Sequence, residues 1–226
     1  MFDRELGLWV ALMIGFEALG FALAFAIGAG IHAAWTRAAG LPADADMPLL
    51  ATIALSLVVG GVEGSLLATG QWLRLRHRIA ELRWSSWAAG TGLGGGLAWV
   101  LGMSLGPHVP ADLPTWMIPV LVVSSGMIFG ALLGSCQWLV LRSHVDRSGL
   151  WIAANSIGWM LGLIAVYLGM ALDVAGPAAI AVSVLSGAVM AITPAVLTGV
   201  VLRRIAPMRD HTAPTARLPR SDPEQA

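Results

Sequence analysis

The stretch GGVEGSLLATGQWLRLR, residues Gly60 to Arg76, decides the fold because the chain contains it twice. A second copy, GMIFGALLGSCQWLVLR, runs from Gly126 to Arg142, 66 residues later, and nine positions are identical without a gap. The match includes the run Gln-Trp-Leu-x-Leu-Arg, which shared hydrophobicity alone does not produce. The pattern therefore indicates an internal duplication, in which one structural unit is repeated along the chain.

The composition is that of a membrane protein. Hydrophobic residues make up 57% of the 226 residues, charged residues only 12%, and the mean hydropathy is +0.78. A chain of this composition is solvated mostly by lipid. The zero net charge argues against a nucleic-acid partner, and the single cysteine, Cys136, excludes an internal disulfide and a cysteine-based metal site. We expect no cofactor.

Six apolar segments are each long enough to cross a hydrocarbon core of roughly 30 Å. They run at about residues 6–28, 49–73, 84–106, 115–141, 150–172 and 177–202. The first is expected to be a retained helix and not a signal peptide, because its flank is not net positive and Glu17 interrupts it. The sequence predicts an all-α polytopic membrane domain over residues 1–205 and a polar, disordered cytoplasmic tail over 206–226.

The arginines predict the orientation of the chain. Twelve of the thirteen basic residues precede the first segment, lie in the second or fourth connection, or follow the sixth segment, and only Arg37 falls on the other side. The positive-inside rule then places both termini in the cytoplasm. The use of arginine without lysine, with much alanine and glycine, suggests a bacterial inner membrane. The first outer loop, roughly Gly28 to Met47, is expected to be the longest.

The duplication extends to the other segments. The sixth segment matches the fourth at Ser186/Ser125, Gly187/Gly126 and Arg203/Arg142, with Thr198-Gly199 in place of the Gln-Trp pair. The fifth segment repeats the Leu-Trp-x-Ala motif of the first. Its Gly158 and Gly162 align with Gly92 and Gly96 of the third segment. The sequence therefore predicts three tandem two-helix repeats in a compact bundle with approximate threefold symmetry. Glycines four residues apart are typical of close helix packing in lipid.

Trp72 and Arg76 are four residues apart, as are Trp138 and Arg142, so each pair lies on one helix face. This spacing is typical of an interfacial tryptophan beside an arginine that reaches toward the headgroups. We interpret both pairs as interfacial anchors.

Three amide side chains are also expected inside the bundle. Gln71 and Gln137 precede the two anchor tryptophans, and each amide requires a hydrogen-bond partner in the membrane. They either bond the helices symmetrically or contact a solute. Asn155, in the fifth segment, is expected to have a structural role.

Glu17 and Glu63 are the acids expected deep in the membrane. Each lies about ten residues from the arginine-bearing end of its helix, or roughly 15 Å deep at about 1.5 Å per residue. A charge at that depth costs about 2.5–3.5 kcal/mol. Because no basic residue lies at this depth, the pair is expected to share a proton, to bind a cation, or to remain protonated as structural hydrogen-bond donors. The second segment carries a weakly polar stripe on the same face: Ser56, Gly60, Glu63, Leu67 and Gly70.

The remaining residues predict no catalytic or metal site. The five histidines form no i, i+4 pair with each other or with an acid inside a segment, and no membrane serine has a partnering base. We therefore expect the protein not to be an enzyme.

The Gly-x-x-x-Gly pattern followed by Gln-Trp-Leu-x-Leu-Arg, present twice in one chain, resembles bacterial multipass membrane proteins of unassigned activity that contain repeated hairpins of this kind. The resemblance covers roughly Gly60 to Gly169, and the sixth segment departs from it at Thr198-Gly199. It implies a polytopic membrane fold and transfers no functional residue.

Two functions of different class stay open, of which the sequence favours the first. One is a non-enzymatic structural or interaction subunit whose arginine-rich face contacts anionic lipid or a membrane-protein partner. The other is a small proton- or cation-linked transporter, or a channel-like permease, that uses Glu17 and Glu63 and moves a small solute. A water-accessible cavity that reaches Glu63 favours transport, whereas a dry, glycine-packed interior favours the structural role.

Overall fold

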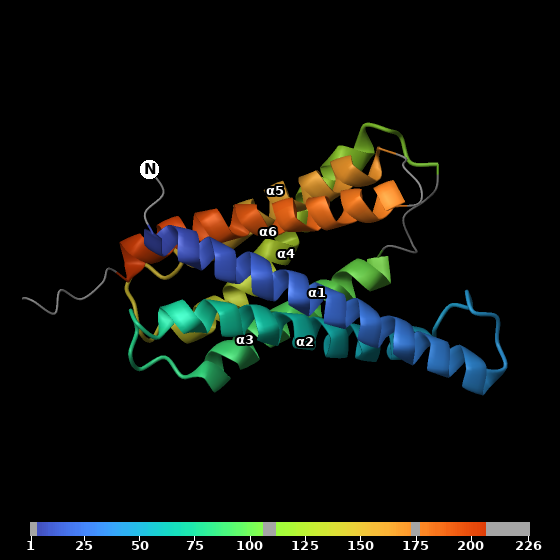
Figure 1. The fold of residues 1–226 in the computed structure, drawn as a ribbon, viewed down its shortest axis with the longest axis horizontal. Coiled ribbons are helices and arrows are strands. Elements are labelled where there is room, and N and C mark those ends of the chain that lie inside the picture. The colour runs from blue at the N-terminus through green and yellow to red at the C-terminus, as the bar shows by residue number, and fades with distance from the viewer. Residues whose placement is uncertain (1–3, 106–111, 173–176, 207–226) are drawn as a thin grey trace, which may run out of the picture.

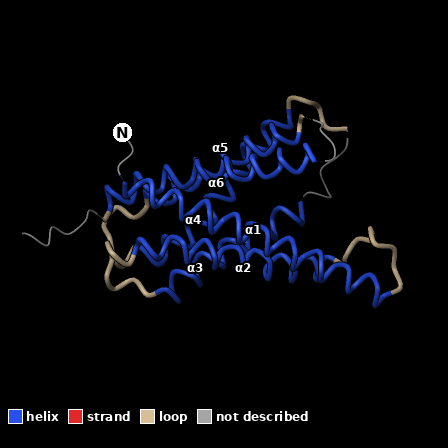
Figure 2. Tube along the Cα trace, in the orientation of Figure 1, coloured by secondary structure: helices blue, strands red, loops and turns tan. Residues whose placement is uncertain are grey.

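The computed structural model describes residues 4–105, 112–172 and 177–206, and these residues form six α-helices and no strands (Figures 1 and 2). The helices are α1 (Arg4–Ala39), α2 (Leu49–Leu75), α3 (Trp84–Leu105), α4 (Met117–Leu141), α5 (Leu150–Met170) and α6 (Pro177–Ile205). An α-helix satisfies its backbone hydrogen bonds within one segment, which suits an apolar chain in lipid. The all-α prediction is confirmed. The expected disordered tail lies almost entirely outside the described residues.

The helices form a closed ring. Each packs against its neighbours in sequence, and α6 packs against α1. The sparsest contacts are those of α3 with α4 and of α1 with α6, which divide the ring into two halves, α1–α3 and α4–α6. The halves meet at the end that holds the start of α1 and the end of α6, and they diverge toward the opposite end (Figure 1). We call these the arginine end and the far end.

The helix bounds agree with the predicted segments except in α1. Elsewhere the largest difference is at the end of α6, which reaches Ile205 where 202 was expected. Helix α1 continues to Ala39, so the predicted long loop from Gly28 to Met47 is wrong. The helix passes through the early glycines and ends only at Gly40, whose φ of 65° is in the left-handed region. The Leu41 amide then donates to the Thr36 carbonyl at 2.9 Å, as at many helix ends.

Five of the six helices are long and apolar enough to cross a membrane, namely α1, α2, α4, α5 and α6. Helix α3 has 22 residues and is rich in glycine, serine and tryptophan. It packs between α2 and α4 in the ring. The chain is therefore a multipass helical membrane protein by length and composition.

Glycines allow α2 and α3 to approach closely. A methyl group at Gly60 would lie 2.6 Å from the Gly95 carbonyl oxygen, and one at Gly95 would lie 2.6 Å from the Gly60 carbonyl oxygen. The two backbones are therefore in direct contact, which matches the packing expected of small residues in lipid. The adjacent Gly61 faces open space, with no described heavy atom within 4 Å of such a methyl group.

This difference allows a matched test of the packing. We expect Gly60→Ala to lower the free energy of unfolding of the purified protein in detergent by about 1–3 kcal/mol, and with it the unfolding temperature, because the methyl group overlaps the Gly95 backbone. Gly61→Ala makes the same chemical change one residue away and should leave the unfolding temperature unchanged or raise it. Equal unfolding temperatures for the two variants would contradict the close α2–α3 contact.

Candidate functional site

Helix α1 turns one polar side chain into the bundle. Its buried residues recur every three or four positions and lie on one face: Leu6, Trp9, Met13, Glu17, Gly20 and Ala24. This spacing is that of a helix stripe facing a core. Glu17 therefore points inward, and only 3% of its surface is exposed.

Helix α2 brings the second acid to the same place. Glu63 is 8% exposed, and every member of its predicted polar stripe is buried. A methyl group at Gly20 would lie 3.1 Å from the Glu63 Cα atom, so α1 crosses α2 directly beside this residue. The sequence prediction that Glu17 and Glu63 lie near each other is thus matched by the helix contact.

Both acids line a central cavity of about 280 Å³. All six helices contribute to its wall, which is otherwise apolar, aromatic or glycine: Phe21, Gly64, Leu67, Gly95, Ala98, Trp99, Gly102, Met103, Phe129, Leu133, Trp159, Leu163 and Met190. Glu17 and Glu63 are the only acids or bases among these lining residues. A space that reaches Glu63, the feature that would favour transport, is therefore present.

The central cavity holds polar groups without hydrogen-bond partners. Both carboxyl oxygens of Glu17, and the indole nitrogen of Trp159, are buried and unpaired within the described chain. Glu63 accepts a hydrogen bond from the indole nitrogen of Trp99. The two carboxyl groups are close enough to interact electrostatically, and a hydrogen bond between them requires a proton because ionised carboxylates only accept. The cavity thus favours a shared proton, a cation or water.

A second cavity, which we call the far-end cavity, has a volume of about 580 Å³ and lies between α1, α2, α3 and the α1–α2 loop. It shares Trp99 and Met103 with the central cavity. Its wall includes Asp44, Asp46 and His32, whose Nε2 atom lies 3.0 Å from the Ala45 carbonyl oxygen. Among the described residues, no cluster of three His, Cys, Asp or Glu side chains is placed to hold a metal ion.

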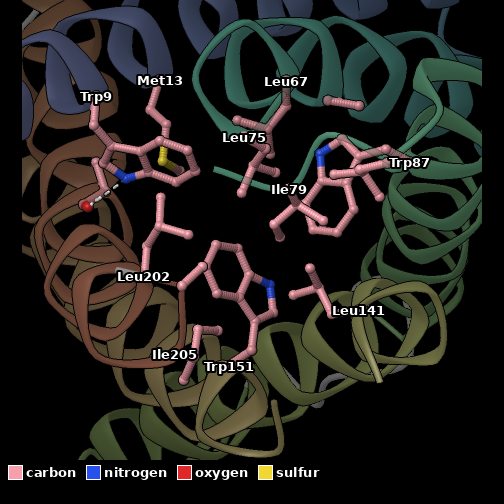
Figure 3. Close-up of a cluster of buried hydrophobic side chains, with 14 of the residues drawn as sticks. Trp9, Met13, Leu67, Leu75, Ile79, Trp87, Leu141, Trp151, Leu202 and Ile205 are labelled. Atoms are coloured by element: carbon pink, nitrogen blue, oxygen red, sulfur yellow. Dashed lines mark hydrogen bonds between the residues drawn. The ribbon is translucent and has the colours of Figure 1, made fainter. Parts of the chain in front are cut away.

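The arginine end is closed by a packed core. Side chains from all six helices point toward one centre there, as Figure 3 shows. Trp9, Trp87 and Trp151 meet edge to face, with ring centroids 6.1 Å apart for Trp9–Trp151 and 5.9 Å apart for Trp87–Trp151. Leu75, Leu141 and Leu202 fill the space around them. This core separates the central cavity from the arginine end.

Each tryptophan of this core donates a hydrogen bond to the neighbouring even-numbered helix. The Trp87 indole nitrogen lies 3.1 Å from Oε1 of Gln71, and that of Trp151 lies 2.7 Å from Oε1 of Gln137. The Trp9 indole nitrogen reaches the Ala195 carbonyl at 2.9 Å and the Thr198 hydroxyl at 3.3 Å. We call these three tryptophans, with their partners Gln71, Gln137 and Thr198, the Trp–Gln cluster.

The predicted polar residues therefore separate into two groups. Gln137 donates to Gln71 at 2.9 Å and to Thr91 at 3.1 Å, and Asn155 donates to Gln137 at 3.5 Å and to the Trp151 carbonyl at 2.9 Å. The three amides bond the helices to one another, and none is among the residues that line either cavity. Only Glu17 and Glu63 of the predicted site residues face the central cavity.

The predicted anchors lie at the arginine end. The Arg76 guanidinium is 5.0 Å from the Trp72 ring centroid, and the Arg142 guanidinium is 5.3 Å from the Trp138 centroid. Both arginines are exposed. The expected stacking of each pair on one helix face is therefore observed.

A further group of charges ties the arginine end together. Glu5 pairs with Arg74 at 3.1 Å and with Arg78 at 2.6 Å. Arg78 also donates to the Ala206 carbonyl at 2.8 Å. These contacts join the start of α1, the end of α2 and the end of α6.

Sequence reasoning missed the partners of the predicted residues. Trp99 and Trp159 face the acids, and Trp87 completes the Trp–Gln cluster, yet none of them was singled out. A signal existed for Trp99, which lies four residues after Gly95 and so shares a face with a residue that contacts α2. No signal in the sequence connected Trp87 with Gln71.

The Trp–Gln cluster generates a stability prediction. We expect Gln137→Leu to destabilise the protein in detergent by about 1–3 kcal/mol, because the buried indole of Trp151 loses its acceptor. Ser125→Ala on the same helix is the matched control, since its hydroxyl bonds only the Val122 carbonyl of α4. Thermal unfolding followed by tryptophan fluorescence measures both. A Gln137→Leu variant as stable as Ser125→Ala would show that the cluster does not hold the arginine end together.

Comparison with protein-family models, with curated proteins and with solved structures gives no match to this chain. The geometry of the cavities and of the Trp–Gln cluster is thus the basis on which its function is inferred.

Proposed function

We propose that this protein is a small proton- or cation-linked permease, with Glu17 and Glu63 as its site. The observation that carries the proposal is the central cavity, which lies inside a ring of six helices and contains two buried acids. Acids inside membrane helices are costly and typically mark proton or ion pathways. The cavity supplies the space that such a pathway requires.

A purely structural role fits this interior less well. A scaffold requires a dry, packed core, and the arginine end has one. The middle of the bundle instead encloses about 280 Å³ beside Glu17, which meets the Glu63 carboxyl group and finds no hydrogen-bond donor in the described chain unless Glu63 is protonated. A buried polar group without a partner costs folding free energy, so its presence favours a functional use.

The site is proposed to work by exchange. With no basic residue in the cavity wall, the acid pair is neutralised either by protons or by a bound cation. Release of a proton from the pair therefore favours binding of a cation, and protonation of the pair favours release of the cation. Because the Trp–Gln cluster closes the arginine end, access to the cavity is proposed to come from the far end.

Placement in the membrane completes this proposal. We propose that α3 also crosses the bilayer, since 22 residues span about 33 Å. The arginine end then faces the cytoplasm with both termini, according to the positive-inside rule, and the membrane is a bacterial inner membrane. The gathering of the helix ends that carry arginine at one end of the bundle supports this orientation (Figure 1).

Cysteine labelling tests the orientation. In a background with Cys136→Ser, we expect a membrane-impermeant maleimide added to intact cells to label Leu41→Cys at the far end. His77→Cys at the arginine end should react only after the membrane is broken, and both positions are exposed in the structure. Labelling of both variants, or of neither, in intact cells would contradict a six-span arrangement with cytoplasmic termini.

The three hairpins are proposed to be tandem copies of one unit. The equivalent bonds of Trp87 to Gln71, Trp151 to Gln137 and Trp9 to Thr198 support approximate threefold symmetry. These bonds make Trp87 of α3 equivalent to Trp151 of α5. The alignment of α3 with α5 that follows from the two tryptophans differs by two residues from the alignment given by the glycine match between the third and fifth segments.

Transport in proteoliposomes tests the proposed function. Liposomes with an acidic interior and a trapped pH indicator receive Na⁺, K⁺, tetramethylammonium or benzyltrimethylammonium outside. We expect at least one of these cations to alkalinise the interior faster than in protein-free liposomes, because it enters as a proton leaves. Glu17→Gln combined with Glu63→Gln should abolish this response.

Controls separate transport from folding. We expect the double variant to remain folded, because glutamine keeps the size and hydrogen-bonding capacity of glutamate. Size-exclusion chromatography of the double variant in mild detergent checks this. Each single change is tested as well, and Glu81→Gln alters an exposed acid at the arginine end that should not affect the rate. A folded parent protein without cation-dependent alkalinisation would overturn the permease proposal. A partner that copurifies in mild detergent would then favour the structural role.

A further inference from the structure

We infer that the central cavity binds a small organic cation that carries one aromatic ring, and that binding releases a proton from the Glu17–Glu63 pair. This inference rests on the proposed function and names the substrate class of that same site. Four features of the described residues carry it: the charge of the cavity, its aromatic wall, its size and the acidic far-end cavity next to it.

The charge of the cavity selects a cation. Glu17 and Glu63 are the only titratable residues in its wall, although all six helices contribute to that wall. An anion would meet two acids and no base, whereas a cation compensates the charge of a carboxylate that has released its proton. A cation is the ligand that compensates a buried carboxylate here.

The rest of the wall selects an organic cation over a metal ion. Ca²⁺ and Mg²⁺ in proteins take six or more oxygen ligands, including waters. Here the two carboxyl groups are surrounded by hydrophobic side chains and glycine. Aromatic side chains from both halves of the helix bundle contribute to the cavity wall. Phe21 and Trp99 come from the first half, and Phe129 and Trp159 come from the second. Aromatic faces attract ammonium groups, by about 2 kcal/mol when desolvated.

The size of the cavity limits the ligand. Pockets for drug-sized ligands have volumes of about 300–1,000 Å³. At about 280 Å³ the central cavity is at the lower limit of this range. It therefore accommodates a molecule with one ring and a short substituent.

The far-end cavity lies next to this site and has two acidic residues in its wall. Asp44 and Asp46 are exposed in its wall, and neither cavity is lined by an arginine of the described chain. Acidic walls raise the local concentration of cations. Trp99 lies in the walls of both cavities and donates to Glu63, so a cation that moves inward passes this indole.

The proton balance follows from the two acids. Before binding, the pair holds at least one proton, since two neighbouring carboxylates in an apolar cavity repel each other. One carboxylic acid then gives up its proton to the solution, and the carboxylate that forms compensates the incoming cation. One cation is exchanged for one proton, with no net change of charge in the cavity.

Calorimetry of the full-length protein in detergent tests the inference. The probe is benzyltrimethylammonium, which carries no exchangeable proton, so any proton released comes from the protein. Titrations in two buffers of different ionisation enthalpy count the protons released per cation bound. We expect saturable binding with about one proton released, and at least about tenfold weaker binding to Glu17→Gln or Glu63→Gln.

Matched ligands and variants isolate each feature. Benzenesulfonate has the ring with the opposite charge and should not bind, and tetramethylammonium has the charge without the ring and should bind about tenfold more weakly. Trp99→Leu should weaken binding, whereas Trp99→Phe should retain most of it if the ring face contributes. Equal effects of the two Trp99 changes would instead assign the role to its hydrogen bond with Glu63 and overturn the aromatic contribution.

The substrate class and the proposed function fail in different ways. If Na⁺ or K⁺ alkalinises the proteoliposomes while benzyltrimethylammonium neither binds nor releases a proton, the permease stands and the organic-cation inference is overturned. If the folded protein responds to no cation in either assay, both fail. Binding of benzenesulfonate as strong as that of benzyltrimethylammonium would show nonspecific uptake into an apolar cavity and would also overturn the inference.

Discussion

Polar groups inside a lipid-solvated bundle must find their partners within the bundle, and this constraint organises the arginine end. There the indoles of Trp87 and Trp151 are paired with the two glutamines, and Trp9 is paired with Thr198. Every bond links helices that are neighbours in the ring, so satisfying the side chains also closes the ring. Close glycine contacts bring the backbones near enough for these short polar side chains to reach across.

The same constraint is not met a few turns further along. Glu17 is almost fully buried and finds no hydrogen-bond donor in the described chain unless Glu63 is protonated, and the indole nitrogen of Trp159 is unpaired. Both groups line the central cavity. At the arginine end the polar side chains of the Trp–Gln cluster have hydrogen-bond partners, whereas these two groups belong to residues that line a space large enough for a polar ligand. This contrast within one ring is the reason to assign the cavity a function.

The sequence predicted the elements and the acids because local patterns specify them. Apolar runs gave the helices, and the spacing of Glu63 with Ser56, Gly60, Leu67 and Gly70 indicated a buried face. The end of α1 was misplaced because the first apolar segment was ended at about residue 28, whereas the helix continues to Ala39 and Gly40, with its positive φ, ends it. The cavity and the Trp–Gln cluster depend on how six helices close into a ring, and spacing within one helix carries no information about that arrangement.

The two halves of the ring suggest how access to the acids changes sides. Hydrogen bonds from Gln137 to Gln71, from Trp9 to Thr198 and from Arg78 to the Ala206 carbonyl join the halves at the arginine end. Each neutral bond is worth about 0.5–1.5 kcal/mol net. The glycine contacts of α2 with α3 and of α4 with α5 lie within the halves, whereas those of Gly94 with Leu133 and of Gly199 with Leu6 lie between them. In the proposed permease, exposure of the acids to the arginine side would therefore require separation of the Trp–Gln cluster and of these contacts between the halves.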